Sequence, residues 1–158
     1  DFYEPAINAA VENYGVKPVD PDDIFGVDCD FFSPCALGAS LNEETIPRLN
    51  CQAVVGSANN QLATDQDADR LMERRILYAP DFVVNAGGLI NVHDELQGYS
   101  KIRALHRVDL IFDATLKILD TAEAHRINPN LAAVKVAEER IQEIGDLRRF
   151  RRSGDDRS

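Results

Sequence analysis

Apolar residues in this chain fall into short runs that alternate with segments of helical spacing, and this alternation predicts an α/β fold with a parallel sheet. Over residues 4–14 the apolar positions recur every three or four residues, and Gly15 follows as a helix stop. The pattern predicts short strands at 16–19, 29–33 and 53–56, an extended link at 77–80, and helices at 42–48 (capped by Asn42) and 65–74.

A further apolar run, Asp81–Val84, ends at Asn85 and turns through Gly87 and Gly88. Apolar residues that do not alternate between faces predict a strand buried on both sides, as in a parallel sheet. The strand at 53–56 also ends in amides, Asn59 and Asn60. Ligands of parallel sheets bind beyond the carboxyl ends of the strands, so these two ends predict a binding crevice.

The second half of the chain is predicted to be helical. From about Ile90 one long helix carries an apolar stripe that continues to Leu119, and Asn128–Pro129 begins a last helix that ends near Ile144. We expect this stripe to be partly uncovered, which favours self-association. The predicted organisation is therefore a sheet domain at 1–90, helices at 91–144 and a disordered tail at 145–158.

Composition excludes several classes of function. The chain has 17 basic and 27 acidic residues and a net charge of −10, which argues against a nucleic-acid partner. No apolar run reaches the ~20 residues of a membrane span, so no membrane partner is expected. Cys29, Cys35 and Cys51 are interpreted as free thiols of a reducing cytoplasm. With the three histidines they lack the usual ligand spacings, so we expect no metal site.

Four motifs then carry a specific resemblance. They are, in chain order, VDCDFFSPCALGA at 27–39, GSANNQL at 56–62, YAPD at 78–81 and NAGG at 85–88. Over residues 1–143 the chain resembles the leucine, valine and phenylalanine dehydrogenases of the glutamate/leucine/phenylalanine/valine dehydrogenase family. The resemblance implies an incomplete Rossmann-type doubly wound sheet, and an enzyme that deaminates an L-amino acid to its 2-oxo acid and ammonia while NAD accepts a hydride.

The resemblance also assigns roles to individual residues. Asn60 is expected to contact the substrate, and six residues are expected to contact the NAD cofactor: Asp1, Cys35, Ala36, Leu37, Asn59 and Asn85. An acidic group such as Asp1 accepts hydrogen bonds from the adenosine ribose and repels the extra phosphate of NADP. From the residues alone, Asp1 is a terminal residue and each Asn is a turn or helix-cap residue, and these interpretations stay open.

Leu89 and Val92 match family positions that line the substrate side-chain pocket. A glutamate dehydrogenase needs a polar group at the second of these positions to hold the distal carboxylate. Val92 lacks one, so an apolar amino acid is the predicted substrate. Leu89 differs from the Val that branched-chain members carry at the first position, which leaves the exact substrate open. His93 and Asp94 are interpreted as a helix-surface imidazole and a solvated or helix-capping carboxylate.

The chain lacks the glycine-rich phosphate loop of a dinucleotide fold. By the resemblance, the catalytic lysines and aspartate belong to a preceding domain, so no residue here is assigned a catalytic role. We therefore expect a C-terminal fragment that is inactive alone and homo-oligomeric within the intact enzyme. The alternatives are a non-catalytic module that binds a nucleotide or a protein, and a glutamate dehydrogenase.

Overall fold

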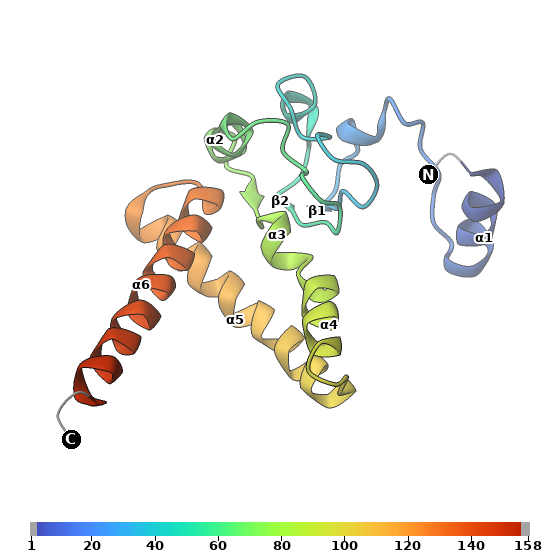
Figure 1. The fold of residues 1–158 in the computed structure, drawn as a ribbon. Helices are drawn as coiled ribbons and strands as arrows, with labels where there is room; N and C mark the ends of the chain where they lie inside the picture. The colour runs from blue at the N-terminus through green and yellow to red at the C-terminus, as the bar shows by residue number, and fades with distance from the viewer. Residues whose placement is uncertain (1–2, 156–158) are drawn as a thin grey trace. The chain divides into compact units, whose positions relative to one another are not determined.

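A computed structural model describes the backbone of residues 3–155 and the side chains of residues 3–145. The chain divides into two compact units, Asp1–Leu77 and Tyr78–Ser158, which are described separately below. The first unit contains a small sheet with short helices, and the second is helical (Figure 1). This confirms the predicted α/β class with a parallel sheet and long C-terminal helices.

The first helix, α1 (Glu4–Tyr14), has the predicted bounds. Pro5 lies in its first turn, where a missing N–H costs no helical hydrogen bond. The helix ends at Gly15 in the left-handed conformation (φ 63°), and its N–H donates to the Val11 carbonyl at 2.9 Å. The strand predicted at 16–19 is wrong: the structure assigns no strand to these residues, and Pro18 cannot donate to a ladder.

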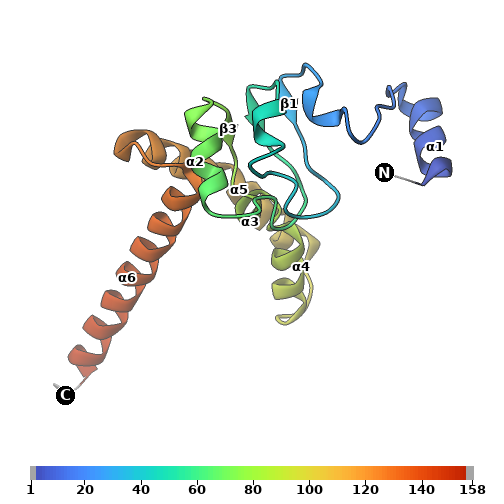
Figure 2. The same ribbon diagram turned by 90° about the horizontal axis from the view of Figure 1, so that it is seen from above.

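The sheet has the strand order β1-β2-β3, with β1 at Phe31–Phe32, β2 at Ala53–Val54 and β3 at Leu77–Tyr78 (Figures 1 and 2). β1 and β2 are parallel, and Phe31 pairs with Ala53. β1 and β2 lie within the strands that the sequence predicts but are shorter, and β3 lies in the stretch at 77–80 that was predicted as an extended link. The Leu77 N–H donates to the Gln52 carbonyl at 2.9 Å.

Short helices complete the first unit: η1 (Ile24–Gly26), η2 (Ile46–Arg48) and α2 (Gln66–Glu73). The predicted helix at 42–48 is reduced to η2, but Asn42 does cap this segment. Its side-chain oxygen accepts from the Glu44 and Thr45 N–H groups at 2.9 and 3.0 Å. Almost fully buried apolar side chains form the core of this unit: Leu41, Ile46, Leu49, Val54 and Leu71.

In the second unit, the strand predicted over Asp81–Val84 is wrong, because these residues form the short helix α3 (Asp81–Val84). Pro80 supplies the carbonyl that accepts from the Val83 and Val84 N–H groups. The Asp81 carboxylate accepts from the Phe82 N–H at 2.8 Å, which places a negative charge at the start of the helix. Asn85 therefore ends a helix rather than a strand.

The single long helix predicted from Ile90 is also wrong, since the structure divides it into α4 (Gly87–Glu95) and α5 (Lys101–His125). Between them Gly98 has a positive φ of 76°, a conformation that favours glycine. Ser100 then caps α5, because its side chain accepts from the Arg103 N–H. Gly98 and Ser100 thus separate two helices, and this break is hard to predict because the apolar stripe continues on both sides of it.

The last helix, α6 (Pro129–Asp155), is capped by Asn128, whose side chain accepts from the Leu131 N–H at 2.9 Å, as predicted. It packs on α5 close to the link between the two helices (Figure 1). Buried Ile118, Ala122, Ala132 and Ala133 form the contact. The helix passes the predicted end near Ile144. The predicted disorder of the tail at 145–158 stays a prediction, and residues 156–158 lie outside the described residues.

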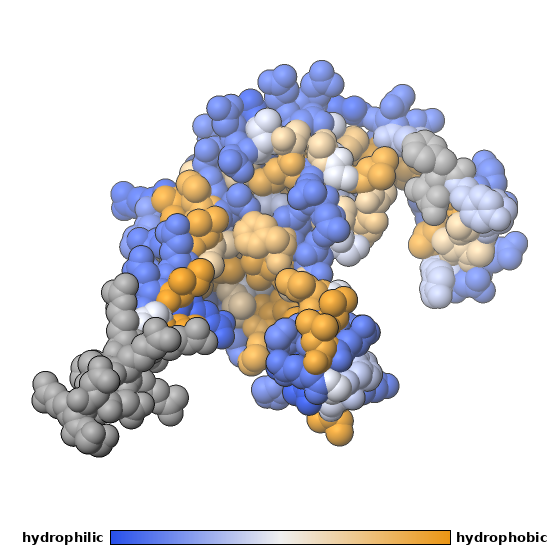
Figure 3. Space-filling model, viewed as in Figure 1, coloured by the Kyte–Doolittle hydropathy of each residue, from blue (hydrophilic) through white to orange (hydrophobic). Residues whose placement is uncertain are grey.

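The apolar stripe predicted on the second half of the chain is exposed, and apolar side chains are open on the face drawn in Figure 3. Its exposed members include Leu96, Ile102, Leu105, Val108, Phe112 and Leu116. None of the helices in the described part of the chain combines the length and the apolar character that crossing a membrane requires.

Candidate functional site

The loops that follow β1 and β2 pack directly against one another. The Ala58 N–H donates to the Pro34 carbonyl at 3.0 Å, and the Val55 N–H donates to the Phe32 carbonyl at 3.1 Å. Gly56 lies so close to Pro34 that a Cβ at this position would be 2.1 Å from the Pro34 carbonyl oxygen. The close approach of the two loops therefore requires glycine at position 56.

Gln61 holds the second loop from inside. Its side chain is fully buried, and its amide nitrogen donates to the Gly56 carbonyl at 2.7 Å and to the Ala58 carbonyl at 3.0 Å. Two buried backbone acceptors are thereby satisfied by one side chain. The sequence reasoning did not single out Gln61 by itself, because a Gln after two Asn residues resembles an ordinary loop residue.

The two loops meet a second time at Gly38. A Cβ there would be 2.8 Å from the Asn59 carbonyl and 2.9 Å from the Asn60 carbonyl. The Ala39 N–H donates to the Asn60 carbonyl at 2.7 Å, and Ala39 and Asn60 both have positive φ angles. The first unit thus brings the predicted Cys35–Leu37 segment and the Asn59–Asn60 pair into one pair of packed loops.

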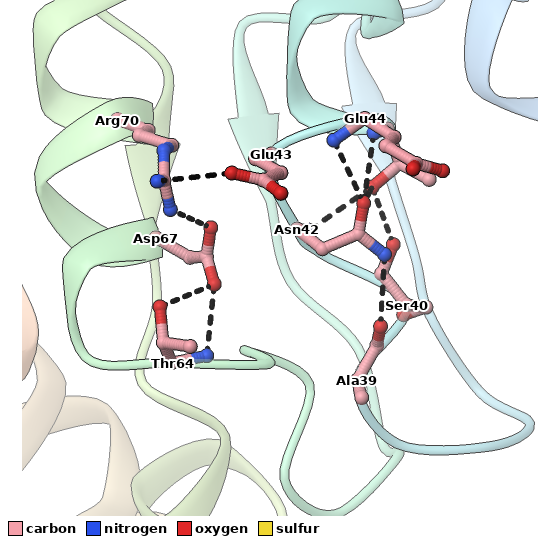
Figure 4. A network of polar contacts seen from close by, with 9 residues as sticks. Ala39, Ser40, Asn42, Glu43, Glu44, Thr64, Asp67 and Arg70 are labelled. Carbon is pink, nitrogen blue, oxygen red and sulfur yellow. Dashed lines mark hydrogen bonds and ion pairs between the residues drawn. The ribbon is translucent and has the colours of Figure 1, made fainter.

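A polar network holds this part of the first unit (Figure 4). The Asp67 carboxylate accepts from the Thr64 N–H and hydroxyl at 2.8 and 2.9 Å, and it pairs with Arg70 at 2.6 Å. The Asn42 amide donates to the Ala39 carbonyl at 3.2 Å. Asp67 is buried and so connects the start of α2 to the chain before it. The loops therefore rest on an ordered scaffold.

The predicted ligand-contacting residues of the first unit are exposed: Cys35, Ala36, Leu37, Asn59 and Asn60. The Ser33 hydroxyl lies 3.4 Å from the Cys35 sulfur. Its hydrogen bond, together with those from Ser57, lowers the pKa of the Cys35 thiol. Asp1, the predicted ribose ligand, lies outside the described residues.

The remaining predicted residues, Asn85, Leu89 and Val92, lie in the second unit. Asn85 is half-buried at the end of α3, and its N–H donates to the Asp81 carbonyl at 2.9 Å. A Cβ at Gly87 or Gly88 would meet no atom within 4 Å. The start of α4 is therefore open, which is what close approach of a ligand would require.

An open hollow of about 640 Å³ lies between α4 and α5 and extends to α6. Leu89 lines it, whereas Val92 is not among the described residues of its lining. Both side chains are exposed. Apolar side chains form most of the wall, and three basic residues, His93, Arg107 and Arg140, also contribute to it. His93 is exposed as predicted, with its Nε2 3.3 Å from the Gln97 amide nitrogen.

Asp94, interpreted from sequence as solvated or helix-capping, is fully buried, so the solvated interpretation is wrong. Its carboxylate accepts from the Ser100 N–H at 2.6 Å and from the Arg103 guanidinium, and Arg107 lies 3.9 Å away. The Arg103 hydrogen bond, followed by that of Ser100, lowers the pKa of Asp94 despite burial. Asp94 therefore joins the end of α4 to the start of α5.

Chemically, these surfaces offer amide groups, backbone edges and apolar walls. Such groups bind and orient a ligand, and exposed amides can donate or accept hydrogen bonds without a change of protonation. Among the described residues, no three His, Cys, Asp or Glu side chains lie close enough together to hold a metal ion. The groups on each surface are therefore suited to binding and orienting a ligand.

The family model for Glutamate/Leucine/Phenylalanine/Valine dehydrogenase matches residues 5–145, which is most of the chain. The chain belongs to this family. The match confirms the resemblance inferred from the four sequence motifs. It also agrees with the position of those motifs in the structure, where two of them form the packed loops after β1 and β2.

Individual members of the dehydrogenase family are similar over nearly the whole chain. Leucine dehydrogenase of Bacillus cereus is 46% identical over 157 residues, which is 99% of this chain and 43% of that protein. Leucine dehydrogenase of Thermoactinomyces intermedius is 49% identical over 142 residues, or 90% of this chain and 39% of that protein. The chain thus spans less than half of the length of the curated relatives that it matches.

The fold is similar to that of a solved dehydrogenase as well. The crystal structure of L-tryptophan dehydrogenase from Nostoc punctiforme superposes with a TM-score of 0.88 at 40% identity. The alignment covers 90% of this chain and 43% of that one. The family and the fold therefore agree, and both concern only part of the length of these relatives.

Proposed function

We propose that this chain is part of an NAD-dependent amino-acid dehydrogenase that converts an apolar L-amino acid to the 2-oxo acid and ammonia. When bound, NAD accepts the hydride that leaves the substrate α-carbon. The residues of this chain bind and orient the two reactants. A lysine of a preceding domain would activate the water that displaces ammonia, so the 158 residues alone would be inactive.

The observation that carries this proposal is the pair of packed loops at the carboxyl ends of β1 and β2. Gly56 and Gly38 allow the loops to meet, while Cys35–Leu37 and Asn59 remain exposed. Nucleotides bind at this edge of doubly wound parallel sheets. We infer that Cys35, Ala36, Leu37, Asn59, Asn85 and the terminal Asp1 contact NAD, as in an incomplete Rossmann-type sheet.

For the substrate, we propose contacts from Asn60, Leu89 and Val92. The Leu89 and Val92 side chains are apolar and exposed, and so could cover an apolar substrate side chain. A distal carboxylate beside them would gain no hydrogen bond from either side chain, and an unpaired carboxylate costs more to bury than the roughly 2–7 kcal/mol of a neutral polar group. This supports leucine, valine, phenylalanine or tryptophan over glutamate.

Two properties of the intact enzyme follow as proposals. The exposed apolar stripe on α5 supports self-association, because monomeric proteins rarely leave large apolar patches open. The three cysteines are free thiols, which supports a reducing compartment such as the cytoplasm.

The test is to express the full-length gene and to follow NAD reduction with leucine, valine, phenylalanine, tryptophan and glutamate as separate substrates. The proposal predicts reduction of NAD with at least one of the four apolar amino acids. Activity with glutamate alone would refute the apolar pocket, and no NAD reduction with any amino acid would refute the proposed reaction.

A further inference from the structure

Two of the three free cysteines lie directly opposite one another on neighbouring parallel segments. Cys29 precedes β1 and Cys51 precedes β2. The pairs Asp28–Asn50 and Phe31–Ala53 share one register, and this register places Cys29 opposite Cys51. The Cys29 N–H donates to the Asn50 carbonyl at 3.1 Å, so the ladder includes this position.

The side chains on either side of the two cysteines confirm this pairing. The Asn50 amide donates to the Asp28 carboxylate at 3.1 Å, and the Gln52 amide donates to the Asp30 carboxylate at 3.0 Å. These two cross-strand pairs lie on one face of the ladder. Because successive side chains point to opposite faces, the Cys29 and Cys51 side chains share the other face.

The spacing of a sheet suits a covalent link between them. Neighbouring strands lie about 4.8 Å apart. The Cα atoms of disulfide-bonded cysteines are usually separated by about 4.4–6.8 Å. Both cysteines are half-buried free thiols, so neither is sealed in the core. The backbone therefore needs no rearrangement to bring the two Cα atoms within range.

The electrostatics agree with two thiols that are near enough to interact. Burial raises the pKa of Cys51, and the negative charge of a Cys29 thiolate raises it further. Two thiolates at this distance repel each other, and oxidation to a neutral disulfide removes that repulsion. A backbone hydrogen bond from Phe32 and the charge of Arg74 lower the pKa of Cys51, but by less than burial and Cys29 raise it.

We propose that Cys29 and Cys51 are a redox-sensitive pair that forms an intramolecular disulfide when the protein meets hydrogen peroxide. One thiolate attacks the peroxide O–O bond, giving a sulfenic acid and, after protonation, water. The second thiol attacks the sulfenic sulfur, the S–S bond forms, and a second water leaves. Two thiols thus lose two electrons and two protons to one peroxide, and a dithiol reductant restores them.

The link would join the segments that enter β1 and β2, whereas the packed loops follow the carboxyl ends of these strands. Oxidation is therefore expected to stabilise the pairing of the two strands while the loop residues proposed to contact NAD keep their positions. This inference concerns a covalent modification of the sheet and does not depend on the proposed reaction.

The test uses the full-length protein, treated with hydrogen peroxide, alkylated under denaturing conditions and digested with trypsin. Cleavage after Arg48 and Arg70 separates the peptide with Cys51 from the peptide that contains Cys29 and Cys35. Mass spectrometry should find the two peptides joined, with the bond at Cys29, and dithiothreitol should separate them. A Cys35→Ser variant should still form the link, and a Cys29→Ser variant should not.

Oxidation of the same protein in urea provides the control for folding. Without the sheet, the shorter separations of Cys35 from Cys29 and from Cys51 favour other links. The native protein should therefore give the Cys29–Cys51 link and the unfolded protein a mixture. A native link through Cys35, full alkylation of both thiols after peroxide, or the same mixture in both states would overturn the proposal.

Discussion

Replacing Gly56 by alanine tests the packing of the two loops that carry the candidate site. The new Cβ would lie 2.1 Å from the Pro34 carbonyl oxygen and 2.6 Å from the Pro34 ring. Non-bonded carbon and oxygen atoms do not approach below about 3 Å, so the loops must move apart by roughly 1 Å. This movement breaks the Ala58–Pro34 hydrogen bond and disturbs the Gln61–Gly56 hydrogen bond.

The magnitude follows from these two hydrogen bonds. Each contributes about 1 kcal/mol, and a buried polar group left unpaired costs about 1–3 kcal/mol. Alanine also lowers the conformational entropy of the unfolded chain, which offsets about 0.4–1 kcal/mol of this loss of stability. The net expectation for Gly56→Ala is a loss of about 2–5 kcal/mol in the free energy of unfolding.

The assay is urea unfolding of the full-length protein, with the KM for NAD as a second measurement. Gly26→Ala is the matched control, because a Cβ there would meet no atom within 4 Å. The control should differ from the wild type by less than about 0.5 kcal/mol, and Gly56→Ala should also raise the KM for NAD. If Gly56→Ala were as stable as Gly26→Ala, the close packing of the two loops would be refuted.

Three further changes test other parts of the structure. Asp94→Asn should lower the melting temperature at pH 7 more than exposed Asp109→Asn does. Because the pKa of Asp94 is lowered, its stabilisation is present above about pH 4 and is lost as pH falls through the folded value, so the deficit should disappear in acid. Val54→Ala should cost about 2 kcal/mol in urea unfolding, since the side chain is fully buried, and more than Val55→Ala on the exposed side. Gly88→Ala should leave the stability in thermal unfolding unchanged or slightly raised, because a Cβ there would meet no atom within 4 Å. If a ligand approaches the start of α4, the same change should weaken ligand binding in the full-length enzyme. A loss of stability would contradict the open space at this position.

The sequence predicted the elements whose signals are local. Helix α1 was predicted with its bounds because Pro5 and Gly15 mark its ends. Strands β1 and β2 were placed by their apolar runs, although the structure shortens both. Asn42 and Asn128 cap the segments that they were predicted to cap. In each case a residue type has a conformational preference that does not depend on distant contacts.

The predictions failed where the apolar pattern alone could not decide the local structure. Over Asp81–Val84 a short apolar run fits a buried strand or one helical turn equally well, and Pro80 with the Asp81 carboxylate decides for the helix. The break at Gly98 was hidden by an apolar stripe that continues on both sides of it. The buried position of Asp94 depends on Arg103 and Ser100, which no local pattern pairs with it.

In the candidate site, too, the sequence predicted some features and missed others. The motifs placed Cys35–Leu37 and Asn59–Asn60 on loops that the structure brings into contact through Gly38. What the sequence could not supply is the support beneath them, because neither a Gln nor an Asp in a loop indicates which neighbouring carbonyl, N–H or hydroxyl its side chain will bind, as Gln61 does with Gly56 and Asp67 with Thr64.

The measurement that tests the central claim most directly is kcat/KM for L-leucine relative to L-glutamate with NAD, in the full-length enzyme and in Val92→Ser. The apolar pocket predicts that the wild type prefers leucine by at least about 30-fold, or about 2 kcal/mol, because an unpaired carboxylate costs more to bury than the roughly 2 kcal/mol that is the least for a neutral polar group. The hydroxyl of the variant should reduce that ratio. A wild type that prefers glutamate, or a ratio that Val92→Ser leaves unchanged, would contradict the proposed substrate pocket.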